Sequence, residues 1–410
     1  MRQSLLLCYG VLTKTYQHKG VSAMMLNTSL FAQILQIIPR GKFARIVSDC
    51  KAERGSKGFT CWDQLVSMLF CQFAQSKSLR EISDGLAVTC GKLVHLGLKN
   101  APPKSTLSYA NAHRTCEVYS KLFNEMLNFC KTCRPGKKTK FRFKNPLLSM
   151  DSTTISLCLT LFPWAEFRQA KGAVKLHMVL DHDGYIPTFA IISDGKAHDI
   201  HAARLVTFPK GSIIACDRGY CDYELFHKWT TESVYFVTRQ KGNAAYEVIE
   251  NRTIPKNSNV LSDQIIQFTG SNAKHDCPDN LRRIVLWDEK NQKEVILLTN
   301  HLNFGATTIA KIYRDRWEIE LFFKTLKQHL KIKTFVGTTP NALAIQIWTA
   351  LIAILLLKYL QFKSKCILTP CRLIALLRLN LFTYRDLWKW LSDPFAVPPL
   401  EPIQQLELTF

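Results

Sequence analysis

Two aspartates interrupt segments that otherwise have the composition of buried β-strands. Asp151 lies within PLLSMDSTTISL, and Asp217 ends the apolar run SIIACD. An ionised carboxylate inside a buried strand costs free energy unless it is paired or binds a metal. Strand ends and the edges of central strands are where open α/β sheets carry their sites, so the two acids predict a sheet with a functional site. Two structural alternatives stay open: Asp151 could cap a turn, and Asp217 could pair with Arg218.

A third acid, Glu320, lies in the strongly basic segment YRDRWEIELFFKTLKQHLK, residues 313–331. At about 100° per residue, a helix over this segment has one polar face and one apolar face. The residues that share the polar face with Glu320 are Tyr313, Arg316, Lys324, Lys327 and Lys331. A salt-bridged surface helix is the simple alternative. The excess of cations over anions favours phosphate binding instead.

Three converging carboxylates would explain all of these acids at once. Asp151, Asp217 and Glu320 would hold two divalent cations, most naturally Mg²⁺, because Mg²⁺ prefers oxygen ligands and acts together with substrate phosphates. Two such ions stabilise the attacking and leaving oxygens of a phosphoryl displacement. The basic helix face would then hold a DNA backbone beside the metals.

The charge of the chain agrees with a polyanionic partner. The 410 residues carry a formal net charge of +22 and have a pI near 9.5. Nucleic acid is therefore the first expected partner, and an anionic membrane surface is the second. No Gly-rich phosphate loop occurs, so we expect no nucleotide cofactor. The 14 cysteines are scattered through apolar segments and are expected to be reduced thiols.

Other candidate metal residues fit simpler roles. Cys130 and Cys133 form the single C-x-x-C, which without a second pair does not predict zinc. We expect no histidine metal site either, because carboxylates already account for the cation; the histidines in question are His177, His182, His198 and His201. The apolar run 342–360 approaches membrane-span length but contains Gln346, so we expect a buried core helix and no membrane association.

The predicted secondary structure changes several times along the chain. Helical patterns in the first third are followed by a basic linker, by four apolar strands with a hairpin turn at DHDG (181–184), and then by further strands and helices. We expect an α/β fold: a catalytic core with an all-β insertion, preceded by an α-helical DNA-binding domain. The expected parts are a disordered or non-native extension (1–24), a helical DNA-binding domain (25–133), a basic linker (134–145), the core (146–232 and 303–362), a β-rich insertion (233–302) and a C-terminal helical region (363–410).

Two of these parts suggest contacts with DNA. The segments SLREISDGLA and STLSYANAHR could form a helix-turn-helix, although their connection is long for that motif, and a plain helical bundle is the alternative. The linker RPGKKTKFRFK carries six basic residues and no acid. We expect it to contact DNA rather than to act as a solvated tether. Its candidate contact residues are Lys137, Lys138, Lys140, Arg142 and Lys144.

The spacing Tyr313-x2-Arg316-x3-Glu320-x6-Lys327 resembles the Y-x2-R-x3-E-x6-K signature of DDE transposases of the insertion-sequence 4 family. Asp151, Asp217 and a β-rich insertion ahead of Glu320 are similar to the arrangement in that family. The helical region ahead of the linker looks like the helical domain that many members carry before the catalytic core. The resemblance covers the chain except for residues 1–24.

The resemblance implies an RNase H-like core that nicks DNA at terminal inverted repeats and joins the 3′ hydroxyl to target DNA. It implies that Asp151, Asp217 and Glu320 are the catalytic residues and the ligands of two Mg²⁺ ions, with Mn²⁺ able to substitute. Tyr313, Arg316 and Lys327 would contact phosphates around the cut. Relatives excise through a DNA hairpin and stack a flipped base on an aromatic residue. Trp287 is a candidate here, with hairpin packing as the alternative.

Double-stranded DNA, as inverted repeats and target, is thus the expected partner. A homodimer is the expected synaptic complex, and the expected location is the bacterial cytoplasm, associated with the nucleoid. Two other functions stay open: an RNase H-like nuclease or resolvase that uses the same acids, and a non-catalytic DNA-binding protein.

Overall fold

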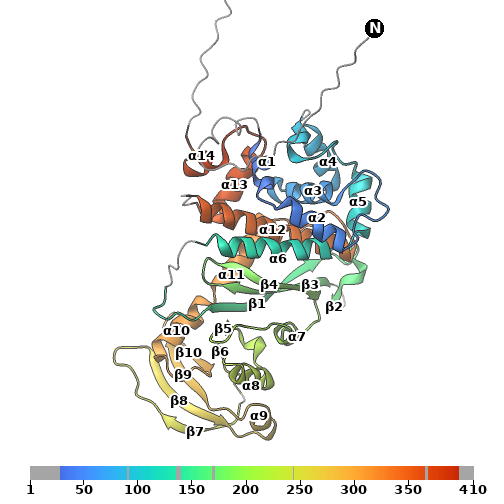
Figure 1. Ribbon diagram of the computed structural model, residues 1–410. Coiled ribbons are helices and arrows are strands. Elements are labelled where there is room, and N and C mark those ends of the chain that lie inside the picture. Colours follow the sequence, from blue (N-terminus) through green and yellow to red (C-terminus); the bar gives the residue numbers. More distant parts are fainter. Residues whose placement is uncertain are drawn as a thin grey trace, which may run out of the picture.

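The computed structural model describes residues 28–89, 92–134, 140–168, 171–242, 244–364 and 368–396. The expected N-terminal extension, Lys137 and Lys138 lie outside these ranges. Within them, the chain forms a mixed α/β structure around one ten-stranded sheet. Helices gather at one end of the molecule, and the last strands of the sheet extend to the other end (Figure 1).

The central part of the sheet has the strand order β4-β3-β1-β5-β6. Strands β1 and β3 are antiparallel, as are β3 and β4, whereas β5 runs parallel to both β1 and β6. The short strand β2 pairs with β3. The bounds are β1 Leu147–Leu157, β2 Glu166–Arg168, β3 Lys171–Asp181, β4 Ile186–Asp194, β5 Ile213–Cys216 and β6 Tyr235–Arg239.

The turn between β3 and β4 is the hairpin that the sequence predicts at 181–184. Gly184 and Tyr185 have positive φ values of 89° and 52°, and glycine adopts such a conformation without strain. Arg134 pairs with Asp181 at 2.9 Å and with Asp183 at 2.8 Å, which fixes the start of the linker to this hairpin.

Four further strands extend the sheet beyond β6. Strand β10 pairs with β6, and β9, β8 and β7 follow in antiparallel order. Their bounds are β7 Tyr246–Asn251, β8 Val260–Phe268, β9 Leu281–Asp288 and β10 Lys293–Thr299. The structure differs from the expected all-β insertion 233–302 in two ways. Strand β6 belongs to the central sheet because it pairs in parallel with β5, and a short helix, α9 (Ser271–Asp276), lies between β8 and β9.

Helices cover the central sheet on both faces. Helix α8 packs on one face with the segment that contains α7, while α11 and α12 pack on the other. The bounds are α7 Asp199–Arg204, α8 Tyr223–Thr231, α10 Ala306–Asp315, α11 Glu318–His329, α12 Pro340–Lys363, α13 Pro370–Asn380 and α14 Leu387–Ser392. Short 3₁₀ helices are η2 Pro163–Ala165 and η3 Arg218–Tyr220.

The N-terminal helices share a hydrophobic core with the second half of the chain. One cluster of buried side chains runs from α1 through α3 and α6 to α11, α12 and one face of β1 and β3. The N-terminal elements are α1 Leu30–Gln36, α2 Arg40–Asp49, α3 Cys61–Ala74, α4 Leu79–Ala87, η1 Lys92–Leu96, α5 Lys104–His113 and α6 Glu117–Thr132. Because η1 separates α4 from α5, these two helices do not form a tight helix-turn-helix.

Helix α12 is the centre of this shared core. Among the described residues it alone is long and apolar enough to cross a membrane by length and composition, and 78% of its most apolar window is buried in the protein. It packs against α6 and α3, as expected for a core helix (Figure 1). The polar Gln346 within it is buried and donates to the carbonyls of Lys331 and Thr334, so its amide is satisfied by the loop after α11.

Candidate active site

The sheet brings Asp151 and Asp217 together. In the parallel pair β1 and β5, Met150 lies opposite Cys216, and the residue that follows each of them in the chain is one of the two aspartates. Neighbouring strands are about 4.8 Å apart, so the two backbones are adjacent at this point. Asp217 follows the end of β5 and caps η3, where its Oδ1 accepts from the Gly219 N–H at 2.6 Å.

Glu320 reaches the same place from the first turn of α11. The segment 313–331, for which the sequence predicts a helix, is interrupted, because α10 ends at Asp315 and α11 begins at Glu318. Arg316 sits at this break. Its Nη1 donates to Asp151 Oδ2 at 3.2 Å and its Nη2 donates to Glu320 Oε1 at 2.7 Å, so one guanidinium joins the two carboxylates.

The three carboxylates affect one another electrostatically. Burial, with smaller contributions from the charges of Asp217 and Glu320, raises the pKa of Asp151 to about 6 against the lowering effects of the Ser152 N–H and of Arg316. A divalent cation would relieve this repulsion and suits an all-oxygen set of side chains. The residues therefore fit a divalent cation in their chemistry. Among the described residues, no three Asp, Glu, His or Cys side chains are close enough to hold an ion. In this arrangement Arg316 pairs with both Asp151 and Glu320.

The structure places some of the predicted phosphate-binding residues beside the carboxylates and others away from them. Tyr313, on α10, lies beside Arg316, whose guanidinium carbon is 5.7 Å from the tyrosine ring centroid. Lys327, on α11, donates to the Thr154 carbonyl of β1 at 2.8 Å, and burial lowers its pKa. Lys324 is exposed on α11. Lys331 lies past the end of that helix, so it does not share the helical face predicted for it.

The linker contributes a contact that the sequence does not predict. Lys140 Nζ donates to Asp315 at 2.8 Å and to Glu318 at 3.1 Å, which ties it to the α10–α11 break. Phe141 stacks on Phe143 with ring centroids 4.9 Å apart. Arg142 and Lys144 are exposed.

A serine, a histidine and an aspartate connect β1 to the same break. Ser149 Oγ lies 2.6 Å from His182 Nε2, and His182 Nδ1 lies 2.7 Å from Asp315 Oδ2. The order of atoms resembles a hydrolase triad. Ser149 is fully buried, however, so no substrate can reach its hydroxyl. The three residues brace Arg316, which follows Asp315, against the strand that carries Asp151.

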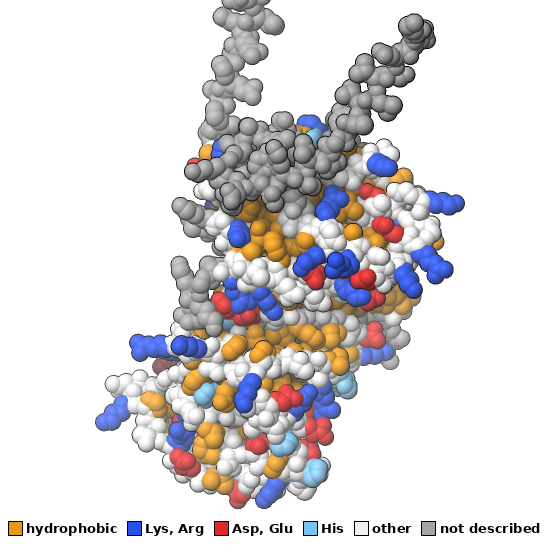
Figure 2. Space-filling view, in the orientation of Figure 1, with side chains coloured by type: hydrophobic (Ala, Val, Ile, Leu, Met, Phe, Trp, Pro, Cys, Tyr) orange, Lys and Arg blue, Asp and Glu red, His pale blue; other side chains and the backbone are white. Residues whose placement is uncertain are grey.

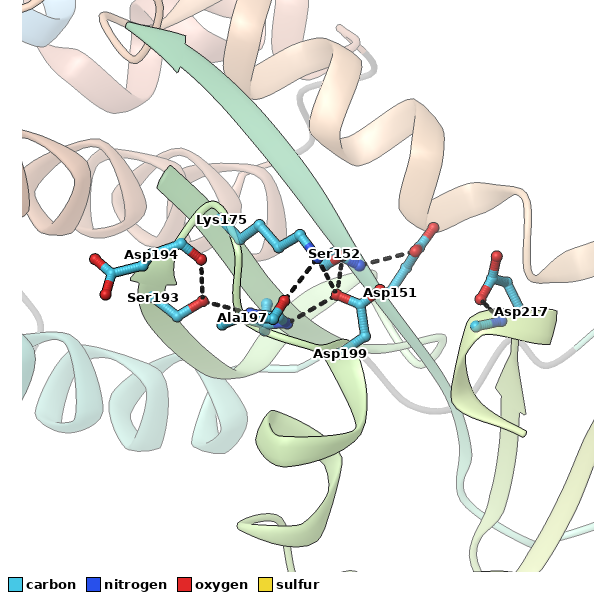
Figure 3. A network of polar contacts seen from close by, with 10 residues as sticks. Asp151, Ser152, Lys175, Ser193, Asp194, Ala197, Asp199 and Asp217 are labelled. Atoms are coloured by element: carbon cyan, nitrogen blue, oxygen red, sulfur yellow. Dashed lines mark hydrogen bonds and ion pairs between the residues drawn. The ribbon is translucent and has the colours of Figure 1, made fainter. Parts of the chain in front are cut away.

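Sequence reasoning missed a fourth acid beside the site. Asp199, the first residue of α7, accepts from Ser152 Oγ at 2.7 Å and from Lys175 Nζ at 3.2 Å (Figure 3). Its position after a strand and close to a histidine was the available signal, but the folded partners that give it meaning come from β1 and β3.

A cavity of about 840 Å³ opens next to Arg316, between α10 and the insertion. Two tryptophans line it: Trp287 from β9 and Trp317 from the α10–α11 break, the latter 56% exposed. Tyr313 and Arg239 line it as well. Trp317 and Arg239 were not among the predicted site residues.

Comparisons with known proteins identify the family of the chain. The family model described as "Transposase DDE domain" matches residues 142–356, and a domain of unknown function, DUF4372, matches residues 26–99. A Sinorhizobium fredii protein named as the transposase y4zB is 30% identical over 70% of this chain and 80% of its own length. The Geobacillus stearothermophilus protein named as the transposase of element IS5377 is 30% identical over 57% of this chain and 61% of its own length.

A third relative, from Synechocystis sp., is named as a transposase for element IS4SA; it is 28% identical over 62% of this chain and 71% of its own length. Among solved structures, a piggyBac transposase synaptic complex with hairpin DNA matches 93% of this chain and 84% of its own, with 12% identity and a TM-score of 0.43.

The chain therefore belongs to the DDE transposase family. It is a transposase of the bacterial insertion-sequence type, an enzyme that cleaves DNA and transfers the cut strand.

Proposed function

We propose that this transposase is of the insertion-sequence 4 type and that Asp151, Asp217 and Glu320 are its catalytic residues. The observation that carries the proposal is the arrangement around Arg316, which joins Asp151 to Glu320 while Asp217 directly follows the neighbouring strand β5. The strand order β4-β3-β1-β5-β6 supports an RNase H-like core, in which a three-stranded antiparallel unit is extended by two parallel strands.

Two Mg²⁺ ions, replaceable by Mn²⁺, would activate the attacking oxygen and stabilise the leaving one when bound to the three carboxylates. The protein groups then have separate tasks. Arg316 would exchange its carboxylate partners for a DNA phosphate, since a guanidinium binds either anion in the same bidentate manner. Lys327 would hold the backbone from the last turn of α11, and Tyr313 would orient Arg316.

The reaction is proposed to be nicking at terminal inverted repeats followed by attack of the freed 3′ hydroxyl on target DNA. No external energy source is needed because one phosphodiester replaces another. The partner is double-stranded DNA, bound by a homodimer when two ends are joined. Lys and Arg side chains are spread from the helical region to the insertion on one face of the molecule (Figure 2), which supports a long DNA contact.

The cavity between α10 and the insertion supports excision through a hairpin. A base turned out of the duplex needs a pocket with aromatic faces next to the reacting phosphate. Trp287 and Trp317 would supply these faces, and Arg239 would hold the adjoining backbone. This assigns the stacking role to two tryptophans, where the sequence offered Trp287 alone.

The test is strand transfer by the purified chain. A pre-cut inverted-repeat end, target plasmid and Mg²⁺ should give joined product, and Asp151→Asn, Asp217→Asn and Glu320→Gln should each abolish it while binding of the end in a gel shift survives. Cleavage of branched DNA without any joining would instead indicate a resolvase. Unchanged joining by the three variants would indicate that the chemistry lies elsewhere.

A further inference from the structure

Two hydrogen bonds in series join Asp199 to Asp151. Asp199 Oδ1 accepts from the Ser152 hydroxyl at 2.7 Å, and the Ser152 backbone N–H donates to Asp151 Oδ1 at 2.8 Å (Figure 3). The other oxygen of Asp151, Oδ2, accepts from Arg316. Each oxygen of the Asp151 carboxylate thus has its own donor, and the residue that supplies one of them, Ser152, is bonded to Asp199 through its hydroxyl.

Asp199 is itself fixed from strand β3. Lys175 Nζ donates to Asp199 Oδ1 at 3.2 Å and to the Ala197 carbonyl at 2.8 Å. The buried His177 places Nδ1 3.5 Å from the same carboxylate oxygen, and its Nε2 lies 2.7 Å from Ser193 Oγ on β4. These contacts determine where the Asp199 carboxylate lies before any ligand binds.

Asp199 also lies close to Asp217. A Cβ atom on Gly219 would come 2.9 Å from Asp217 Oδ1 and 3.6 Å from Asp199 Oδ2, so both carboxylates border the same small gap. A side chain at residue 219 would push against them. Burial, followed by the charges of Asp199 and Asp151, raises the pKa of the neighbouring Tyr220, which agrees with this crowding of carboxylates.

We propose that Asp199 is a positioning residue that orients the Asp151 carboxylate for cation binding, acting through Ser152. This inference rests on the proposed function of Asp151 as a metal ligand. A carboxylate held by a single donor can rotate about its Cβ–Cγ bond, whereas a second fixed donor restricts it to one orientation. Outer partners that orient a metal ligand typically change metal affinity by about 10- to 100-fold when removed.

A purely structural ion pair would not need this arrangement. The Lys175 and Asp199 side chains are 17% and 25% exposed, and their ion pair does not require a hydrogen bond to Ser152. The hydroxyl of Ser152 is directed at Asp199 while its N–H is directed at Asp151, so the residue relays position from one carboxylate to the other. Lys175 offsets the added negative charge.

The test compares Ser152→Thr with Ser152→Val in the full-length chain. Both side chains are branched and suit a strand, and only Thr keeps the hydroxyl, while the pair of Asp199 and Lys175 stays intact in both. Mn²⁺ binding to the DNA-free protein is measured by titration calorimetry. Ser152→Val should weaken binding about 10-fold, and Ser152→Thr should bind as the wild type does. Asp199→Ala should match Ser152→Val, and the double variant should be no weaker than either single one, because both changes break one relay.

Asp194→Ala is the matched control, since Asp194 is an exposed carboxylate at the end of β4 beside the same network. It should leave Mn²⁺ affinity unchanged. If Asp151→Asn abolishes binding while Ser152→Val binds as tightly as Ser152→Thr, the positioning role is overturned and the proposed function stands. If the wild type itself does not bind Mn²⁺, the proposed metal site fails and the inference falls with it.

Discussion

Arg316 and Arg282 both form ion pairs with carboxylates, but they differ in the number of carboxylates that each one binds. Arg282 binds one partner with two parallel bonds, Nε to Asp263 Oδ1 at 2.8 Å and Nη2 to Asp263 Oδ2 at 2.7 Å, and its third nitrogen donates to the carbonyls of Leu302 and Phe304. Both side chains are almost fully buried, at 2% and 3% exposure.

Arg316 divides its bonds between two carboxylates, and its buried Nε has no hydrogen-bond partner among the described atoms. Glu320, one of its two partners, is 33% exposed. We call Arg282 with Asp263 the closed pair, because it is buried and bidentate and joins strands of the insertion. We call Arg316 with Asp151 and Glu320 the open pair, because its bonds are divided between two carboxylates and Glu320 is partly exposed. In the proposed function, Arg316 would leave its carboxylates for a phosphate, whereas Arg282 keeps Asp263 as its partner.

The largest expected effect concerns chemistry at the open pair. Asp151→Asn should reduce cleavage of an inverted-repeat end by about 10³-fold or more, because it removes a charged oxygen where charge must be stabilised. The fold should persist, because burial disfavours the ionised form of Asp151 and raises its pKa to about 6. A neutral amide at this position avoids the free-energy cost of burying a charge. Single-turnover cleavage and a thermal melt measure the two quantities. Asp263→Asn is the control and should show the reverse pattern, with lost stability as the primary defect.

The next effect is on the closed pair. Arg282→Met should lower the free energy of unfolding by about 3–5 kcal/mol, because it leaves Asp263 charged and unpaired in the interior. Urea denaturation measures the loss. Adding Asp263→Leu should recover part of it, since the remaining cost is then limited to the two carbonyls that lose their donor. A loss of less than 1 kcal/mol in the single variant would contradict the assignment of a closed structural pair.

Acid should weaken the region around Arg282 before it weakens the rest. Burial, with a smaller contribution from the charge of Arg282, lowers the pKa of His301 from 6.5 to about 4. The ring accepts the Phe304 N–H at Nδ1, which requires an unprotonated nitrogen. Because the folded pKa lies below the unfolded one, stability is complete above pH 6.5 and falls between pH 6.5 and 4, by about 3 kcal/mol. His301→Asn keeps an acceptor and should flatten this part of a stability–pH curve. A curve unchanged by the substitution would remove His301 as the cause.

A smaller effect is expected from Arg316 itself. Arg316→Gln should lower cleavage by about 10²-fold, since it removes one phosphate ligand and leaves all three carboxylates. Without metal, the variant should melt earlier than the wild type because Asp151 and Glu320 lose their counter-charge, and Mg²⁺ should raise its melting temperature more than it raises that of the wild type. Arg316→Lys keeps the charge and should show the activity loss without the metal-free instability.

The smallest effect should come from the linker. Lys140 is already paired with Asp315 and Glu318, so Lys140→Ala should cost at most about 1 kcal/mol and leave the salt dependence of DNA affinity unchanged. Lys324→Ala, at an exposed lysine of α11, should instead reduce the slope of log affinity against log salt by about 1. Equal slopes for both variants would return Lys140 to the predicted DNA contacts.

The sequence predicted the parts of the site that short segments encode. Asp151 and Asp217 could be recognised because each interrupts an apolar strand, and the hairpin at 181–184 because its residues suit a tight turn. The break between α10 and α11 could not be predicted, because the helical pattern of residues 313–331 continues through Arg316 and Trp317. Only the packing of Asp315 against His182 and Lys140 shows why the helix ends there.

Contacts between residues far apart in the chain could not be predicted, because no short segment contains both partners. Asp199 acquires its role from Ser152 and Lys175, which are 47 and 24 residues away in the chain. The helical region was predicted as a domain ahead of the linker, yet its buried side chains form one cluster with α11 and α12. The apolar face of an amphipathic helix shows that the helix packs against another surface, but it does not identify that surface.

The contacts between α1 and the C-terminal helical region cannot form until nearly the whole chain has been synthesised. Gln33 of α1 donates to the carbonyl of Arg385, 352 residues further on, and the N–H of Phe31 donates to the carbonyl of Leu381. At a synthesis rate of about 5–20 residues per second, α1 waits roughly 20–70 s on the ribosome before its partner exists. During that interval α1 can pack only against other N-terminal helices, as Phe31 does against Phe73 of α3, and the surface that it shares with the C-terminal helices stays uncovered.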